Sequence, residues 1–395
     1  MLALAADRVA AARHAAQSMV EEVIDLTARI ASVAAPTFAE EARAQLISDL
    51  LRKGGYTTVT NDDIGDVIGT IGATSTPDPV QLLLAAHLDT VFPEDTPLVI
   101  RRDGLRLYGP GVGDNSISLA ALVLLPRLLR EAGVELESEV KVTGNVGEEG
   151  LGNLRGMRAV MDALPSIGAV VAIEGHGLGR VSHSAVGSRR LRIRTTGPGG
   201  HSWGNAGRQS AIHVLAGIVA KLDRIPLTSN PRTSFNVGLF EGGVSVNTIA
   251  PRAEAVIDMR SADPSSLARL SDQVEEVVRE FAHDEIDTTI EVLGERPSGS
   301  LSPDSRIIAV ARSALACLGI DAIFDASSTD ANIPISRGIP GICIRLTQGG
   351  NDHREDEYIE TAPLVDGLAQ LVLVVDQLSR DLAAGKITSL ALERP

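Results

Sequence analysis

Apolar residues recur at three- and four-residue spacing in several stretches of the chain, with short, nearly continuous apolar runs between them. The first pattern indicates helices with one buried face, and the second indicates buried strands. In the first half of the chain we predict helices over 5–33, 39–53, 118–131 and 153–164, and strands over 82–86, 140–143 and 169–173. Strands that alternate with helices in this way predict an α/β fold around a mostly parallel sheet.

The pattern changes after Gly187, where the regular alternation stops. Here we predict strands over 190–196, 235–239 and 253–260 and helices over 210–222 and 264–282. Two helices on a small, largely antiparallel sheet form a separate α+β module. The α/β pattern then resumes with a helix over 305–318, a strand over 341–346 and a helix over 364–382. We therefore predict one α/β domain, 1–186 and 299–395, interrupted by an α+β domain at 187–298.

Composition limits the number of domains, the possible partners and the location that the sequence predicts. A length of 395 residues suggests two or three domains, and a net charge of −15 argues against nucleic acid or an anionic membrane as a partner. Cys317 and Cys343 are too few for a disulfide framework or a thiolate zinc cluster. Charges at Asp7, Arg8 and Arg13 interrupt any signal-peptide core, and no apolar run approaches the ~20 residues that span a bilayer. We predict a soluble, cytoplasmic protein.

The most informative residues follow the apolar run 82–86, where the chain reads His87-Leu88-Asp89-Thr90. Side chains alternate along a strand, so His87 and Asp89 lie on one face. A histidine ligand oriented by a nearby carboxylate is a common arrangement at metal sites. Taken alone, such a histidine is more often structural, and its interpretation depends on the residues that accompany it.

Three other apolar runs also lead to acids or a histidine, and a glycine-rich loop carries one more acid. In chain order these residues are Asp114, Glu148-Glu149, Glu174 and His353. Loops at the carboxyl ends of strands form the ligand crevice of an open α/β sheet. We therefore expect these residues to meet His87 at one site.

Two histidines and three carboxylates suit two divalent ions about 3.5–4 Å apart, with one carboxylate bridging them. Mixed imidazole and carboxylate ligands favour zinc, and cobalt or manganese also fit. Because neighbouring side chains diverge, one of Glu148 and Glu149 can ligate a metal while the other accepts a proton from the bound water. The sequence therefore predicts a hydrolytic two-metal site.

Four motifs resemble those of a known family: His-Leu-Asp-Thr-Val-Phe at 87–92, Gly-Val-Gly-Asp-Asn at 111–115, Gly-Glu-Glu-Gly at 147–150 and Gly-Gly-Asn-Asp-His at 349–353. In this order they resemble the dinuclear zinc hydrolases of the aminoacylase, glutamate carboxypeptidase and tripeptidase T family, the M-twenty peptidases. The resemblance covers nearly the whole chain. It implies a zinc-exopeptidase-like catalytic domain with an inserted lid or dimerisation domain.

The resemblance also implies roles for individual residues. His87, Asp114 and Glu174 would bind one metal ion, and Asp114, Glu149 and His353 would bind the other. Glu148 would be the general base, and Asp89 would orient His87. A cis peptide bond is implied between Asp114 and Asn115.

The inserted region resembles the same family. Gly199-Gly200-His201-Ser202 is similar to the dimerisation-domain motif, whose histidine reaches the partner subunit's active site and stabilises the oxyanion. Segments 241–247 and 258–260 resemble substrate-binding strands. Asn247, Gly349 and Arg260 are therefore candidate substrate-binding residues, the arginine as a clamp for a carboxylate. A helix entry at His201 and a surface position at Arg260 are the alternatives.

The chain departs from the family at two points. Where many members have Glu-Pro-Thr it has Glu174-Gly175-His176, which is closer to the tripeptidase T-like branch, and Asn115 follows the bridging acid. His176 could compete as a metal ligand, but a position next to the ligands without binding the metal, or one at the rim of the site, is favoured. Both departures leave the substrate class open.

The main hypothesis is a metallo-exopeptidase similar to an aminotripeptidase, acting on small peptides as a homodimer. An N-acyl amino-acid deacylase or a carboxypeptidase is the second hypothesis, because these enzymes share the metal core. A metal-binding scaffold without turnover is the third, and the complete ligand set together with Glu148 argues against it.

Overall fold

The computed structural model describes residues 4–72, 80–282 and 284–387. The chain divides into two compact units: unit 1 is Met1–Ala185 with Ser300–Pro395, and unit 2 is Val186–Gly299. The large cluster of buried apolar residues in unit 1 shares no member with the cluster in unit 2. Each unit thus has a hydrophobic core of its own.

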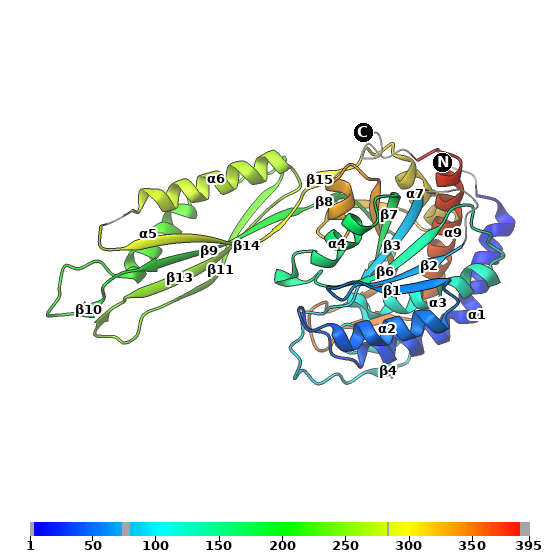
Figure 1. Ribbon diagram of the computed structural model, residues 1–395, viewed down its shortest axis with the longest axis horizontal. Helices are drawn as coiled ribbons and strands as arrows, with labels where there is room; N and C mark the ends of the chain where they lie inside the picture. Colours follow the sequence, from blue (N-terminus) through cyan, green and yellow to red (C-terminus); the bar gives the residue numbers. More distant parts are fainter. Residues whose placement is uncertain (1–3, 73–79, 283, 388–395) are drawn as a thin grey trace. The chain divides into compact units, whose positions relative to one another are not determined.

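The central sheet of unit 1 has the strand order β1-β2-β6-β3-β7-β17-β8-β15, with β16 paired to β8 (Figure 1). Its middle strands β6, β3, β7 and β17 run parallel, which confirms the predicted mostly parallel sheet. Strands β1 and β2 pair antiparallel at one edge, and β8 pairs antiparallel with β17. The strands are β1 (Thr58–Asn61), β2 (Val67–Ile71), β3 (Gln81–His87), β6 (Val140–Asn145), β7 (Ile167–His176), β8 (Arg180–Ala185), β15 (Gly299–Ser300), β16 (Ile323–Ser327) and β17 (Gly341–Thr347).

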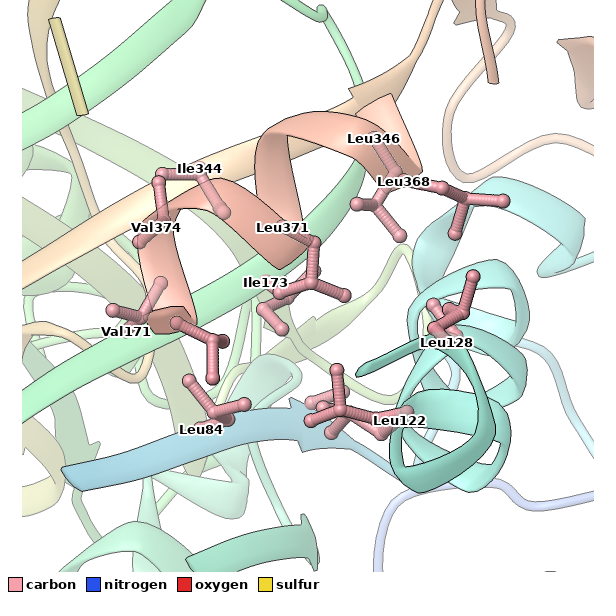
Figure 2. Packing of buried hydrophobic residues seen from close by; sticks show 14 of the residues in the cluster. Leu84, Leu122, Leu128, Val171, Ile173, Ile344, Leu346, Leu368, Leu371 and Val374 are labelled. Atoms are coloured by element: carbon pink, nitrogen blue, oxygen red, sulfur yellow. The ribbon is translucent and has the colours of Figure 1, made fainter. Parts of the chain in front are cut away.

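Helices cover both faces of this sheet. Alternate residues of β3 enter different cores: Leu84 packs with residues of α1, α3, α7 and α9, whereas Leu83 packs with residues of α4 and α8. Figure 2 shows the first core, where Leu122 of α3 and Leu371 of α9 lie over Leu84 and the neighbouring strands. The helices are α1 (Ala6–Ala31), α2 (Glu41–Lys53), α3 (Ile117–Glu131), α4 (Arg155–Ala163), α7 (Arg306–Cys317), α8 (Asn332–Ser336) and α9 (Leu364–Ala383).

The helical segment Val112–Glu131 is long and apolar, but it is buried in unit 1. Among the described residues it is the one helix long and apolar enough to cross a membrane, and 83% of its most apolar window is buried inside the protein. Serines and Pro126 interrupt its apolar residues, so the sequence shows no continuous run of that length. Leu122 and Leu128 face the core, so the segment is a buried helix of unit 1 (Figure 2).

A second, small sheet of unit 1 brings two distant loops together. Its strand order is β18-β19-β5-β4, and all its pairings are antiparallel. The strands are β4 (Arg101–Asp103), β5 (Arg106–Tyr108), β18 (Gly349–Gly350) and β19 (Tyr358–Glu360). Because β5 pairs with β19, the loop that follows Tyr108 lies beside the loop that precedes Tyr358. These loops carry Asp114 and His353.

Unit 2 is an antiparallel sheet with two helices. The strand order is β11-β13-β9-β14, and every neighbouring pair is antiparallel. Its elements are β9 (Gly187–Thr196), α5 (Ala211–Leu222), β11 (Thr233–Gly242), β13 (Arg252–Ser261), α6 (Pro264–Glu280) and β14 (Asp287–Arg296), with a short ribbon of β10 (Gly200–His201) and β12 (Thr248–Ile249) (Figure 1). Leu215 of α5 and Val274 of α6 pack with Ile193 and Ile257 of the sheet.

Candidate metal centre

The predicted site residues of unit 1 lie at the carboxyl ends of its parallel strands. His87 is the last residue of β3, Glu174 lies near the end of β7, and Glu149 and His353 lie in the loops after β6 and β17. These strands are adjacent in the sheet, so their carboxyl ends meet at one edge. That edge is where ligands bind in open α/β sheets.

Asp114 connects the two histidines. Its Oδ1 lies 2.9 Å from Nε2 of His87, and its Oδ2 lies 3.1 Å from Nε2 of His353. Oε1 of Glu149 lies 3.2 Å from the same nitrogen of His353, and Oε2 of Glu174 lies 3.8 Å from Nε2 of His87. The five residues therefore form two imidazole–carboxylate clusters that share one carboxylate. Ligand atoms of His87, Asp114 and Glu149 all lie within 4.8 Å of one another, as a metal site requires.

The acids of the site favour positive charge on both imidazoles. Burial opposes the charged form of His87, yet hydrogen bonds to Asp114, Asp89 and Glu174 raise its pKa well above the usual value. Contacts with Asp114 and Glu149 raise the pKa of His353 to about 11. A divalent cation can replace the proton between each imidazole and its carboxylates, so metal binding would release protons. This donor set of imidazole and carboxylate suits zinc, cobalt or manganese.

Asp89 contacts both His87 and the turn that carries Glu148 and Glu149. Nδ1 of His87 lies 3.0 Å from the backbone oxygen of Asp89 and 3.5 Å from its carboxylate, so the closer contact is with the backbone. The carboxylate accepts hydrogen bonds from the backbone N–H groups of Glu148, at 3.0 Å, and Glu149, at 2.9 Å. It also accepts from the hydroxyl of Thr37 at 2.9 Å. Asp89 therefore fixes both the His87 ring and the turn that carries the two glutamates.

Glu148 lies in that turn, next to Glu149. Its residue is only 6% exposed, so a proton on its carboxylate is shielded from bulk water. Of the two glutamates, Glu149 contacts His353, to which the family resemblance assigns the same metal ion.

The loop that carries Asp114 is held by a residue that the sequence analysis missed. Glu357 is completely buried, and its carboxylate accepts hydrogen bonds from the backbone N–H groups of Gly111, Gly113 and Asp114. The peptide bond between Asp114 and Asn115 is cis, as the family resemblance implies. The segment 351–357 is polar throughout and shows no periodic pattern, so nothing in the sequence distinguished Glu357 from its neighbours.

His176 contacts residues around the site and not the five predicted ligands. Its Nδ1 lies 3.0 Å from Asp352 and its Nε2 lies 3.2 Å from the backbone oxygen of Tyr358. Gly349, a predicted substrate-binding residue, packs against the His176 ring. A second missed acid, Asp330, is also buried here and accepts two hydrogen bonds of 2.9 Å from the amide of Asn145.

The other predicted residues belong to unit 2. His201 is exposed on β10, and its Nδ1 accepts hydrogen bonds from the backbone N–H groups of Trp203 and Gly204, each at 3.2 Å. In a neutral ring the proton is then on Nε2, which makes that nitrogen a donor. The backbone oxygen of Asn247 accepts from Ser202 at 3.0 Å. Nε of Arg260 donates to Asp258 at 2.7 Å.

Comparisons with known proteins agree with this geometry. The model of peptidase family M20/M25/M40 matches residues 83–377. The chain is 24% identical over 338 residues to the protein YqjE of Bacillus subtilis (strain 168), covering 82% of this chain and 87% of that protein. It is 24% identical over 353 residues to carboxypeptidase G2 of Pseudomonas sp. (strain RS-16), covering 85% and 82% respectively.

Solved structures share the fold. The aminopeptidase PepT of Bacillus cereus ATCC 10987 superposes with a TM-score of 0.75 at 20% identity, covering 91% of this chain and 98% of that chain. The dipeptidase Dug1p of Saccharomyces cerevisiae superposes with a TM-score of 0.77 at 14% identity, covering 95% and 99%.

Proposed function

The chain belongs to peptidase family M20/M25/M40, and from this premise we propose that it is a two-metal exopeptidase acting on small peptides. One observation carries the proposal: Asp114 places one carboxylate oxygen against His87 and the other against His353. A carboxylate shared in this way is suited to bridge two divalent ions. His87, Asp114 and Glu174 would hold one ion, and Asp114, Glu149 and His353 the other.

When bound, the two ions would supply a water activated by a lowered pKa. Glu148 accepts the proton of this water as its oxygen adds to the amide carbonyl carbon. Nε2–H of His201 donates to the oxyanion that forms. Glu148 then returns the proton to the leaving nitrogen as the C–N bond breaks.

A tripeptide is the substrate that we propose first. The motif Glu174-Gly175-His176 supports this choice, because it is closer to the tripeptidase T-like branch than to members with Glu-Pro-Thr. A carboxypeptidase is the second candidate, because the similar protein of Pseudomonas carries that name. In that case Arg260 would bind the substrate carboxylate through its guanidinium.

The test is metal analysis followed by a substrate panel. The purified chain is stripped of metal, titrated with Zn²⁺, Co²⁺ or Mn²⁺, and assayed on a tripeptide, a dipeptide, an N-terminally blocked dipeptide and an N-acetyl amino acid. We expect two metal equivalents and the highest kcat/KM on the tripeptide. Preference for the blocked dipeptide would favour the carboxypeptidase, and preference for the N-acetyl amino acid the deacylase. Metal binding without turnover on any of them would leave the non-catalytic scaffold.

We further propose a homodimer through unit 2, in which His201 completes the partner's site. The edge strand β11, which exposes Leu239 and Phe240, supports unit 2 as the contact surface. Mixing the inactive variants Glu148→Ala and His201→Ala tests the arrangement. If His201 acts across the dimer, mixed dimers contain one intact site and activity returns. If His201 acts within its own chain, mixing restores nothing.

A further inference from the structure

A buried side chain and a partly buried one, both outside the proposed ligand set, connect the segments that carry three of the ligands. We propose that His176 and Glu357 form one support that positions Asp114 and His353 for the metal pair. This inference rests on the proposed two-metal function, and it assigns positioning roles to residues that touch neither the metal nor the substrate.

Glu357 fixes the backbone at the bridging acid. Its Oε1 accepts from the N–H groups of Gly113, at 2.7 Å, and Asp114, at 2.9 Å, and its Oε2 accepts from Gly111 at 2.9 Å. Three backbone donors thus converge on the two oxygens of one buried carboxyl group. The backbone from which the Asp114 side chain projects is therefore held in one conformation.

His176 fills the space between this loop and the loop that carries His353. A Cβ added at Gly113 would lie 2.0 Å from its Nε2, and one added at Gly349 would lie 2.2 Å from its Cδ2. Both glycines therefore permit the imidazole to sit against their backbone. The ring is part of the packing at this point.

Both ring nitrogens of His176 contact residues within 352–358, on the side of the loop that carries His353. Nδ1 contacts Oδ1 of Asp352 at 3.0 Å, and Asp352 precedes His353. Nε2 contacts the backbone oxygen of Tyr358 at 3.2 Å and lies 3.6 Å from Oε1 of Glu357. These partners all belong to the segment that follows His353 or immediately precedes it, whereas the ring meets the loop of Asp114 by packing against Gly113.

His176 also lies two residues after Glu174 on β7, so one rigid strand carries a proposed ligand and the support. Movement of the 109–114 loop or of the 351–357 loop would break contacts with this strand. Outer residues that hold ligands in this way commonly change metal affinity by 10- to 100-fold when mutated. The support would act on the geometry of the metal ligands. If His176 and Glu357 only stabilised the fold, their replacement would leave that geometry unchanged.

The test compares metal binding by His176→Ala, His176→Asn and Glu357→Gln with the wild type. The Asn side chain keeps a donor near the position of Nδ1, toward Asp352, and the Gln side chain keeps one acceptor for the loop amides. His14→Gln and Glu355→Gln are matched controls, because both residues are exposed. Zn²⁺ affinity is measured against a competing chelator, and the visible absorption of the Co²⁺ form reports ligand geometry.

We expect His176→Ala and Glu357→Gln to bind Zn²⁺ about 10- to 100-fold more weakly and to shift the Co²⁺ bands. His176→Asn should recover part of the affinity, and the controls should match the wild type. Circular dichroism checks the fold, and if Glu357→Gln does not fold, the two His176 variants decide. Wild-type affinity and Co²⁺ spectra in the folded variants would overturn the inference.

The test of these positioning roles can be told apart from a test of the proposed peptidase function. A wild type that binds two metal ions but hydrolyses nothing would overturn the peptidase, while the metal titrations would still decide the roles of His176 and Glu357. A wild type that binds no metal would overturn both.

Discussion

At the scale of single residues, Glu148 carries the most direct prediction. Its backbone is fixed by Asp89, and its neighbour Glu149 contacts His353. We expect Glu148→Ala to retain the wild-type metal stoichiometry while kcat falls about 10²- to 10⁴-fold, because proton transfer is lost and the ligands remain. Metal content and steady-state kinetics measure both quantities, with Glu355→Ala as an exposed control. A variant with nearly full activity would exclude Glu148 as the base.

Asp66 makes stability depend on pH. It is completely buried, and its Oδ1 accepts from the N–H of Val146 at 2.8 Å, just before the turn that carries Glu148 and Glu149. Burial, together with the carboxylates of Asp62 and Asp330, raises the pKa of Asp66 to about 8. The folded state therefore binds a proton that the unfolded chain has released, between the ordinary pKa of an aspartate and about 8. Across that window the free energy of unfolding falls as pH rises.

We accordingly expect Asp66→Asn to stabilise the protein at pH 8 and to flatten this pH dependence. The amide keeps an acceptor for Val146 and has no charge to bury, and a gain of about 1–3 kcal/mol is the scale of one unfavourable buried polar group. Urea denaturation at pH 5 and pH 8 measures it, with exposed Asp63→Asn as the control. An equal effect at both pH values would contradict the assignment.

The site was largely accessible to sequence analysis, and its supports were not. His87, Glu148-Glu149, Glu174 and His353 follow apolar runs, and parallel strands bring their ends to one edge. Glu357 and Asp330 have no such marker, because each reaches the site through tertiary packing. His176 was recognised as unusual, but its role depends on Gly113 and Gly349, which only the folded chain places around it.

At the scale of elements, Arg43 joins three segments. It lies on α2, is 1% exposed, and donates to the backbone oxygen of Val33 after α1 and, at 3.0 Å, to that of Leu88 after β3. Burial lowers its pKa to about 10, so it stays charged at neutral pH. Leu88 separates His87 from Asp89, so this contact also fixes the strand end at the site.

We expect Arg43→Met to lower the free energy of unfolding by about 2–4 kcal/mol, because a buried carbonyl oxygen at Leu88 and a partly buried one at Val33 lose their donor. Metal affinity should also fall, because the segment that carries His87 loses its contact with Arg43. Arg52→Met, on the exposed side of the same helix, is the control. Chemical denaturation measures the change, and equal stability of the two variants would refute this role.

Long elements were predicted well and short ones were missed. The predicted helix 118–131 is observed as Ile117–Glu131, and the predicted strand 82–86 as Gln81–His87. Strands β4, β5, β18 and β19 have two or three residues each, too few for a periodic pattern to develop. β14 was missed although it has 10 residues, because much of it is exposed and its apolar residues are few.

At the scale of the whole molecule, metal should stabilise the two units unequally. All five proposed ligands lie in unit 1, and binding to the folded state alone adds about 4 kcal/mol at a metal concentration 1,000 times Kd. We expect chelation to lower the melting temperature of a transition that belongs to unit 1 and to leave a unit 2 transition unchanged. Scanning calorimetry with and without chelator measures this. A thermogram insensitive to chelator would contradict the metal site.

The path of the chain between the two units has a consequence for how such proteins diversify. β9 and β14, which begin and end unit 2, are hydrogen-bonded neighbours, and β8 and β15, which flank it in unit 1, are adjacent in the central sheet. The chain thus leaves and returns at one point, and rejoining that point costs little loop entropy. An insertion of this kind can be exchanged, enlarged or removed while the strand order of the sheet in unit 1 stays the same. A change within unit 2 therefore need not alter the strands of unit 1 that carry the proposed ligands.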